Sequence, residues 1–183
     1  AGGTAEKTHG LAEFVAQEEM DRHTGYWWSP DSKSIAYTEA DHAGVEVWHI
    51  ADPLRPDRGP QPQYYPRPGK KNVSVRLGVV PVEGGKTVWV EWDRKRYEYL
   101  ARVRWTKPGI AVLVQTRPQS ILTQFMYPWP AEKSQPTWID SGASPWLDID
   151  QYRLEPTAAG ARYFILTASA PRKGQQADPD GHN

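Results

Sequence analysis

The chain has 183 residues, with 22 Lys and Arg residues balanced by 22 Asp and Glu residues and no cysteine. This length is sufficient for one domain with a hydrophobic core. A formal charge of zero gives no overall attraction to nucleic acid, so we expect no nucleic-acid partner. The absence of cysteine excludes disulfides and thiolate-ligated metals.

The chain contains no apolar run of the ~20 residues that a membrane-spanning helix needs, so we expect no membrane segment in it. The first residues, Ala1 to Thr4, have neither a basic nor an apolar character, and no targeting signal is read there. A domain of this size does not require disulfides in either an oxidising or a reducing compartment. The compartment stays open, with a periplasmic or secreted location favoured over a cytoplasmic one.

The first half of the chain is predicted to form mainly strands. Only Leu11 to Met20 shows the apolar spacing of a helix, while 17 prolines and 15 glycines interrupt the rest of the chain. Two-residue alternation predicts strands at Ser34–Ala40 and Val73–Val80. A tight turn at Glu83–Lys86 then leads into a strand at Thr87–Trp92, with its glycines supplying positive φ. The proline-rich stretch from Asp52 to Gly69 is interpreted as an insertion, with a polyproline ligand as the alternative.

The second half continues in the same way. Short proline-containing turns separate three strands that we expect to form an antiparallel meander, at Leu100–Trp105, Ile110–Thr116 and Ser120–Tyr127. Three further strands are expected at Pro136–Ile139, Asp150–Leu154 and Ala161–Thr167. The pattern therefore begins again after the second proline-rich stretch.

A weak internal repeat suggests how these strands are organised. An apolar residue precedes a proline turn and a strongly apolar strand at Trp28, Trp105 and Leu154, and the second interval matches the ~40–50 residues of a propeller blade. The prediction is an all-β fold in which antiparallel meanders form about two to three blades of a β-propeller, as an open fragment. A β-sandwich with uneven loops is equally compatible with the repeat. Residues 1–176 are assigned to a partial propeller domain, and 177–183 to a disordered tail or truncation point.

The most informative motif is a pair of acids, Glu18 and Glu19, followed by the turn Trp27-Trp28-Ser29-Pro30-Asp31. The segments Phe14–Arg22 and Gly25–Ser32 resemble the propeller domain of the dipeptidyl peptidase IV family. The resemblance resumes weakly over Tyr65–Val73 and Tyr99–Trp105 and is mostly architectural after Thr116.

The resemblance implies that Glu18 and Glu19 hold the free amino terminus of a peptide substrate, supported by Arg22 and Tyr26. An ammonium group offers three donors, and each charge-assisted hydrogen bond to a carboxylate contributes ~1.5–3 kcal/mol. A hydrolase domain absent from this chain would then release N-terminal Xaa-Pro or Xaa-Ala dipeptides. Because neighbouring carboxylates repel, we expect Arg22 or a group outside the chain to relieve the repulsion. The alternative is that the two acids end a solvated helical turn or pair with Arg22.

Other residues indicate no chemistry of their own. The Gly-x-Ser-x-Gly elbow of a serine hydrolase is absent, so no catalytic residue is assigned and Ser144 is interpreted as a loop serine. The five histidines lack metal-ligand spacing, and no metal or cofactor is expected. Asp148 and Asp150 are assigned to a solvated turn. The tryptophans are expected in the core and between blades, with sugar stacking as the alternative. They are Trp27, Trp28, Trp89, Trp92, Trp105, Trp138 and Trp146.

The expected partners follow from these assignments. They are the amino terminus of a peptide, the missing hydrolase domain, the remaining blades, and a second copy in a homodimer. Two rival functions remain on the sequence alone. One is a binding or scaffold propeller without catalysis, and the other is a sandwich-like domain that binds sugars through its tryptophans.

Overall fold

The computed structural model describes residues 2–107, 109–130, 137–143, 154–156 and 164–166. Ser144, Asp148, Asp150 and the tail predicted at 177–183 lie outside these residues. The strands are β1 (Lys7–His9), β2 (Tyr26–Trp28), β3 (Ser34–Asp41), β4 (Val47–Ile50), β5 (Gln61–Tyr64), β6 (Ser74–Pro81), β7 (Val88–Val90), β8 (Tyr99–Thr106), β9 (Gly109–Gln115), β10 (Ile121–Pro128), β11 (Thr137–Ala143), β12 (Leu154–Pro156) and β13 (Phe164–Leu166). One short helix, α1 (Phe14–Glu19), accompanies them, so the helix predicted over Leu11 to Met20 is shorter than expected.

The first sheet has five antiparallel strands. Its order is β1-β3-β6-β7, with β2 paired to the first half of β3. Along β3, every second residue is buried, which is the two-residue period expected when one face of a strand covers a core. The predicted hairpin between β6 and β7 is confirmed, and its turn uses Gly84 and Gly85 at φ values of 91° and 124°.

The second sheet is the antiparallel meander expected from the sequence, with the order β11-β10-β9-β8. Strand β9 is buried along its whole length, because both faces are covered. The β8–β9 turn ends at Gly109, whose φ is 149°. A Cβ atom there would collide with the carbonyl oxygen of Tyr127, so the close approach of β10 requires glycine. Strands β12 and β13 pair separately.

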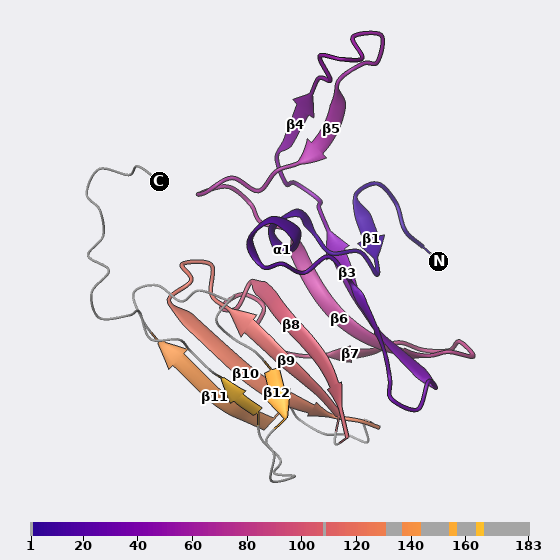
Figure 1. Cartoon of the computed structure of the whole chain (residues 1–183), viewed down its shortest axis with the longest axis vertical. Helices are drawn as coiled ribbons and strands as arrows, with labels where there is room; N and C mark the ends of the chain where they lie inside the picture. Colours follow the sequence, from indigo (N-terminus) through magenta and orange to yellow (C-terminus); the bar gives the residue numbers. More distant parts are fainter. Residues whose placement is uncertain (1, 108, 131–136, 144–153, 157–163, 167–183) are drawn as a thin grey trace.

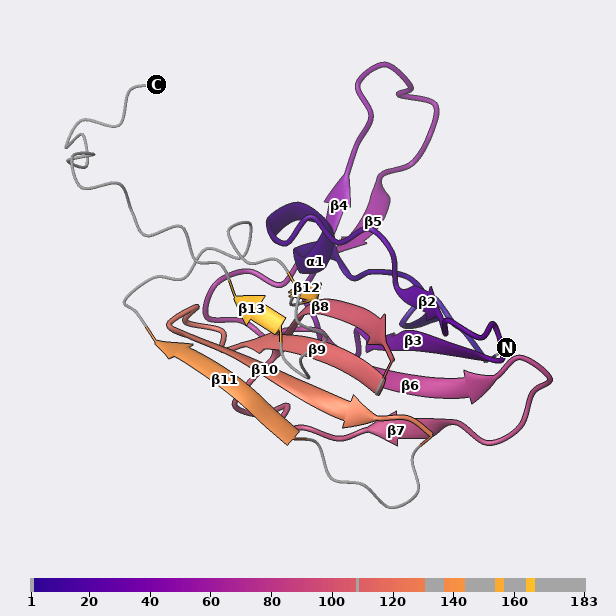
Figure 2. The same cartoon turned by 60° about the horizontal axis from the view of Figure 1, so that its bottom comes forward.

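One hydrophobic core joins the two sheets. Leu77 and Val79 of β6 belong to the same buried cluster as Val112 of β9 and Phe125 of β10. Seen from the side, the two sheets lie next to each other as open layers (Figure 2). The part of the chain that the structure describes is therefore all-β with open antiparallel sheets, as predicted.

The tryptophans follow the prediction only in part. Trp92 is buried, and the Trp105 indole donates a hydrogen bond of 2.9 Å to the carbonyl oxygen of Trp27 across the two sheets. Trp28, by contrast, is 52% exposed and is not a core residue.

The proline-rich stretch from Asp52 to Gly69 contains β5, which pairs with β4 in a hairpin that stands away from both sheets (Figure 1). Strands β4 and β5 pair only with each other, while β3 and β6, on either side of them in the sequence, are direct neighbours in the first sheet. The hairpin is thus inserted between two adjacent strands. We refer to residues 46–67 as the arm.

Candidate functional site

Helix α1 is held against the second sheet. Ala16 and Met20 are fully buried and share a small hydrophobic cluster with Ala101 of β8 and Leu113 of β9. The carbonyl oxygen of Met20 also accepts a hydrogen bond from the guanidinium group of Arg102. Glu18 and Glu19 close the helix, so their backbone is positioned by these contacts.

A buried ion pair connects the two ends of this helix. Arg22 donates from Nη2 to both carboxylate oxygens of Glu13, at 2.8 and 3.0 Å, and the two side chains are only 5% and 3% exposed. Arg22 Nε also donates to the carbonyl oxygen of Leu100 in β8, at 3.2 Å. The charge of Arg22 is therefore balanced by Glu13. Arg22 thus pairs with Glu13 rather than with Glu18 or Glu19, and relief of the repulsion between the two acids by a group outside the chain stays a prediction.

Beside the helix lies a cavity of about 700 Å³, here called the α1 cavity. It is lined by Phe14, Val15, Glu19, Tyr65, Pro66, Pro68, Gly69, Glu98, Tyr99, Arg117, Pro118 and Gln119. These residues come from α1, from the segment that follows β5, from the start of β8, and from the turn between β9 and β10. Ligand pockets are typically ~300–1,000 Å³ with mostly apolar walls and a few polar groups, and the α1 cavity has that character.

The two glutamates are placed differently. Glu19 lines the α1 cavity, whereas Glu18 is not one of the described residues that line it. Consecutive residues of an α-helix point ~100° apart, which accounts for the difference. Both carboxylates are exposed, and neither makes a hydrogen bond or ion pair with a described residue. Glu19 therefore offers an unpaired carboxylate at the edge of a ligand-sized cavity.

The cavity has polar groups that sequence reasoning did not single out. Burial raises the pKa of Tyr99, and the negative charges of Glu98 and Glu19 add to the effect while Arg117 opposes it. The Tyr99 hydroxyl is therefore neutral at neutral pH and keeps its donor proton. Glu98 is held by Arg117 at 3.7 Å and by Asn72 at 3.2 Å. The only signal for these residues was the start of the segment Tyr99–Trp105.

The apolar wall links the helix to the arm. Phe14 packs edge-on against Tyr65, with ring centroids 4.9 Å apart, and Tyr65 packs against Trp48 at 5.3 Å. Such aromatic pairs are worth ~0.5–1.5 kcal/mol beyond their buried area. The shape of the cavity therefore depends on how the arm is seated at its base.

The remaining candidate residue lies elsewhere. Tyr26 is on β2, is 51% exposed, and is outside the described lining of the α1 cavity. Within the part of the chain that the structure describes, no group of three or more potential ligands is arranged to hold a metal ion. No described helix is long and apolar enough to cross a bilayer.

Comparisons with known proteins all lead to one family. The family model described as "Dipeptidyl peptidase IV (DPP IV) N-terminal region" matches residues 1–171. Mouse dipeptidyl peptidase 8 is 30% identical over 124 residues, which cover 56% of this chain and 14% of that protein. Rat inactive dipeptidyl peptidase 10 is 28% identical over 122 residues, covering 62% of this chain and 15% of that protein.

A solved structure shares the fold. Porphyromonas gingivalis dipeptidyl peptidase 4 superposes with a TM-score of 0.70 at 21% sequence identity, covering 80% of this chain and 21% of that one. The chain thus spans about a seventh of the curated relatives it matches and about a fifth of the solved one.

Proposed function

The chain belongs to the dipeptidyl peptidase IV family, as part of its N-terminal propeller region, and on that premise we propose that α1 anchors the free amino terminus of a peptide through Glu18 and Glu19. The released product would be an N-terminal Xaa-Pro or Xaa-Ala dipeptide. The bond would be cleaved by a hydrolase domain outside this chain. Residues 1–176 would form one domain with further blades.

One observation supports this proposal most strongly. Glu19 borders a cavity of about 700 Å³ and has no ion-pair or hydrogen-bond partner among the described residues. A carboxylate is an acceptor-only group, and a peptide ammonium is a donor-only group, so the two are complementary. The neutral Tyr99 hydroxyl and the apolar side chains of Phe14 and Tyr65 supply the rest of a peptide-sized environment.

The role of the chain's own residues is to hold and orient the peptide. A rigid anchor places one end of a peptide at a fixed point, so only a bond at a set distance along the chain reaches the reacting groups. The Glu13–Arg22 ion pair and the buried Met20 make α1 such an anchor. The hydrolase domain would then cleave only the bond that lies a fixed number of residues from the amino terminus.

The test measures the recognition of the amino group itself. In the complete protein, we would compare the binding of a product-like dipeptide with a free amine and of its N-acetylated form. Wild type should prefer the free amine, and Glu19→Gln should lose most of that preference. Glu83→Gln, a change of the same kind in the exposed β6–β7 turn, should keep it. Equal preference in wild type and Glu19→Gln would refute the anchor.

A second function has support of its own. The match to a relative whose name includes "inactive" covers more of this chain than the match to dipeptidyl peptidase 8. The same region would then serve a binding or scaffold protein that has no hydrolytic activity. The complete reading frame distinguishes the two functions, together with an assay for release of Xaa-Pro dipeptides. A hydrolase domain without its nucleophile, and no release, would favour the second.

A further inference from the structure

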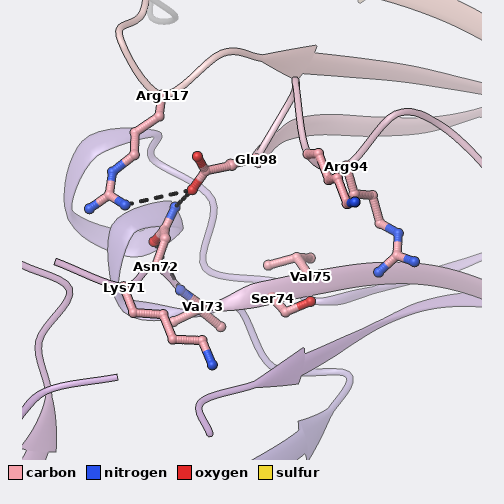
Figure 3. Close-up of a pocket in the computed structure, with 9 residues that line it drawn as sticks. Lys71, Asn72, Val73, Ser74, Val75, Arg94, Glu98 and Arg117 are labelled. Atoms are coloured by element: carbon pink, nitrogen blue, oxygen red, sulfur yellow. Dashed lines mark hydrogen bonds and ion pairs between the residues drawn. The ribbon is translucent and has the colours of Figure 1, made fainter. Parts of the chain in front are cut away.

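A second cavity lies beside the α1 cavity and is strongly basic. It has a volume of about 370 Å³ and is here called the basic pocket. Its lining consists of Lys71, Asn72, Val73, Ser74, Val75, Arg94, Lys95, Glu98 and Arg117. These residues come from the segment that enters β6, from the loop between β7 and β8, and from the turn after β9. Figure 3 shows Arg117, Asn72 and Lys71 on one side of the pocket and Arg94 on the other.

Most of the positive charge in this pocket is not neutralised. Lys71, Arg94 and Lys95 are exposed, and their side chains make no hydrogen bond or ion pair with a described residue. The pKa of Asp41 is lowered mainly by the backbone N–H of Ala43 and by Lys7, which lies 3.2 Å from its carboxylate, and Lys71 makes the smallest contribution. Three cations that have no partner among the described residues therefore line this concave site.

The single carboxylate of the pocket is already engaged. Glu98 accepts from Asn72 at 3.2 Å and lies 3.7 Å from Arg117, whose other nitrogen donates to the carbonyl oxygen of Arg67 at 3.1 Å. Figure 3 shows Glu98 directed toward Asn72 and Arg117. One negative charge set against four positive ones leaves a net attraction for an anion. Glu98 occupies part of the position that an incoming carboxylate would take.

Glu98 and Arg117 line both cavities, so the basic pocket and the α1 cavity meet along these two side chains. We propose that the basic pocket binds a carboxylate of an acidic peptide whose amino terminus is held at Glu19. The chain would thus select peptides that carry Asp or Glu beyond the anchored residues. This inference rests on the proposed function. Arg and Lys side chains around a concave site are the groups that proteins use for carboxylate recognition.

The experiment uses the complete protein and a series of peptides with a free amino terminus. A single Asp is moved from the third to the sixth position, and each peptide is matched by one with Asn at the same place. An extended chain advances ~3.3 Å per residue, so one position in the series should bind best. The preference for Asp over Asn at that position should be about tenfold, the size of one charge-assisted contact.

Three variants test the pocket directly. Lys71→Met with Arg94→Met should abolish the preference for Asp, while the control pair Lys86→Met with Lys107→Met, two exposed lysines in other turns, should keep it. Glu98→Gln should strengthen the binding of the Asp peptide, because Arg117 is released. An unchanged preference in the Lys71 and Arg94 variant would overturn the proposal.

Two further outcomes are distinct. If the anchor is wrong, Glu19→Gln keeps the wild-type preference for the free amine, while the Lys71 and Arg94 variant still loses the preference for Asp over Asn. If the basic pocket is wrong, wild type discriminates the free amine but not Asp from Asn. Succinate and inorganic phosphate are the last two ligands to be tested. Binding of either one as tight as that of the Asp peptide, and equally sensitive to the Lys71 and Arg94 variant, would show a site for small anions and overturn the peptide assignment.

Discussion

Arg22 and Glu13 form a buried ion pair in which Nη2 of Arg22 donates to both carboxylate oxygens of Glu13, at 2.8 and 3.0 Å, and which joins the residue before α1 to the segment after it. The pair is tied to β8 through the carbonyl oxygen of Leu100. The helix has only six residues, and its N-cap residue makes no capping hydrogen bond. A helix this short is not stable by itself, so its position depends on these tertiary contacts.

Breaking this ion pair should destabilise the protein strongly. We expect Glu13→Gln or Arg22→Met to reduce the free energy of unfolding by ~3–5 kcal/mol. The first variant leaves the charge of Arg22 buried without a partner, and the second leaves the charge of Glu13 in that state. Arg22→Lys should retain part of the stability, since it keeps the charge but loses the Nε donor that bonds the carbonyl oxygen of Leu100. Urea unfolding of the complete protein measures the change. The exposed pair Arg55 and Asp57 gives the control.

For that control, Asp57→Asn should change the free energy of unfolding by less than ~1 kcal/mol. A comparable loss in the two experiments would show that the burial of the Glu13–Arg22 pair has no special importance. Unchanged stability in Glu13→Gln would contradict the arrangement described for α1.

The two acids of the motif should differ in their effect on catalysis. If the region works with a hydrolase domain, Glu19→Gln should lower kcat/KM for Xaa-Pro substrates by ~10–100-fold, the equivalent of one charge-assisted hydrogen bond. Glu18→Gln should have a smaller effect, because only Glu19 lines the α1 cavity. Steady-state kinetics of the two single variants and the double variant test this. A larger loss in Glu18→Gln would reverse the assignment.

Local sequence patterns were sufficient for most of the strands, because alternation and turn residues act over a few positions. They could not reveal the partner of Arg22. Glu13 is close in sequence but lies outside the spacing of three or four residues that a helix brings together, and the position of Arg22 also depends on Leu100 of β8, 78 residues further along the chain. The same reason explains why Tyr99, Glu98 and Arg117 were missed: they approach Glu19 only when the second sheet packs on α1.

Tyr99 should make the protein sensitive to alkaline pH. Burial raises its pKa above the ordinary value of 10.0. A pKa raised in the folded state contributes stability that is present below the unfolded pKa and is lost as pH rises through the folded pKa. Tyr99→Phe should therefore show a shallower loss of stability above pH 10 than wild type. Thermal unfolding as a function of pH measures this, with Tyr26→Phe on the exposed β2 as the control. Parallel curves for wild type and Tyr99→Phe would contradict the prediction.

The packing of the arm against the rest of the protein should weaken at acidic pH. Glu46, before β4, and Arg67, after β5, form two hydrogen bonds of 2.6 and 2.7 Å at the base of the hairpin, and Arg67 lies over the ring of Trp48. The hydrogen bond from Arg67 is the main reason that the pKa of Glu46 lies below its ordinary value of 4.5. A lowered pKa contributes stability that is present above the unfolded pKa and is lost as pH falls through the folded pKa.

Glu46→Gln should therefore loosen the arm at neutral pH in the way that acid loosens wild type. We expect hydrogen exchange of the β4 and β5 amides, corrected for intrinsic rates, to be faster in the variant at pH 7, and the two proteins to converge as the pH falls below 4.5. Amides of the second sheet should stay protected in both, and Glu83→Gln should behave as wild type. Tyr65, at the base of the arm, packs on Phe14. A looser arm should therefore also weaken peptide binding in the α1 cavity. Faster exchange of the arm with unchanged peptide affinity would show that the arm and the cavity are independent.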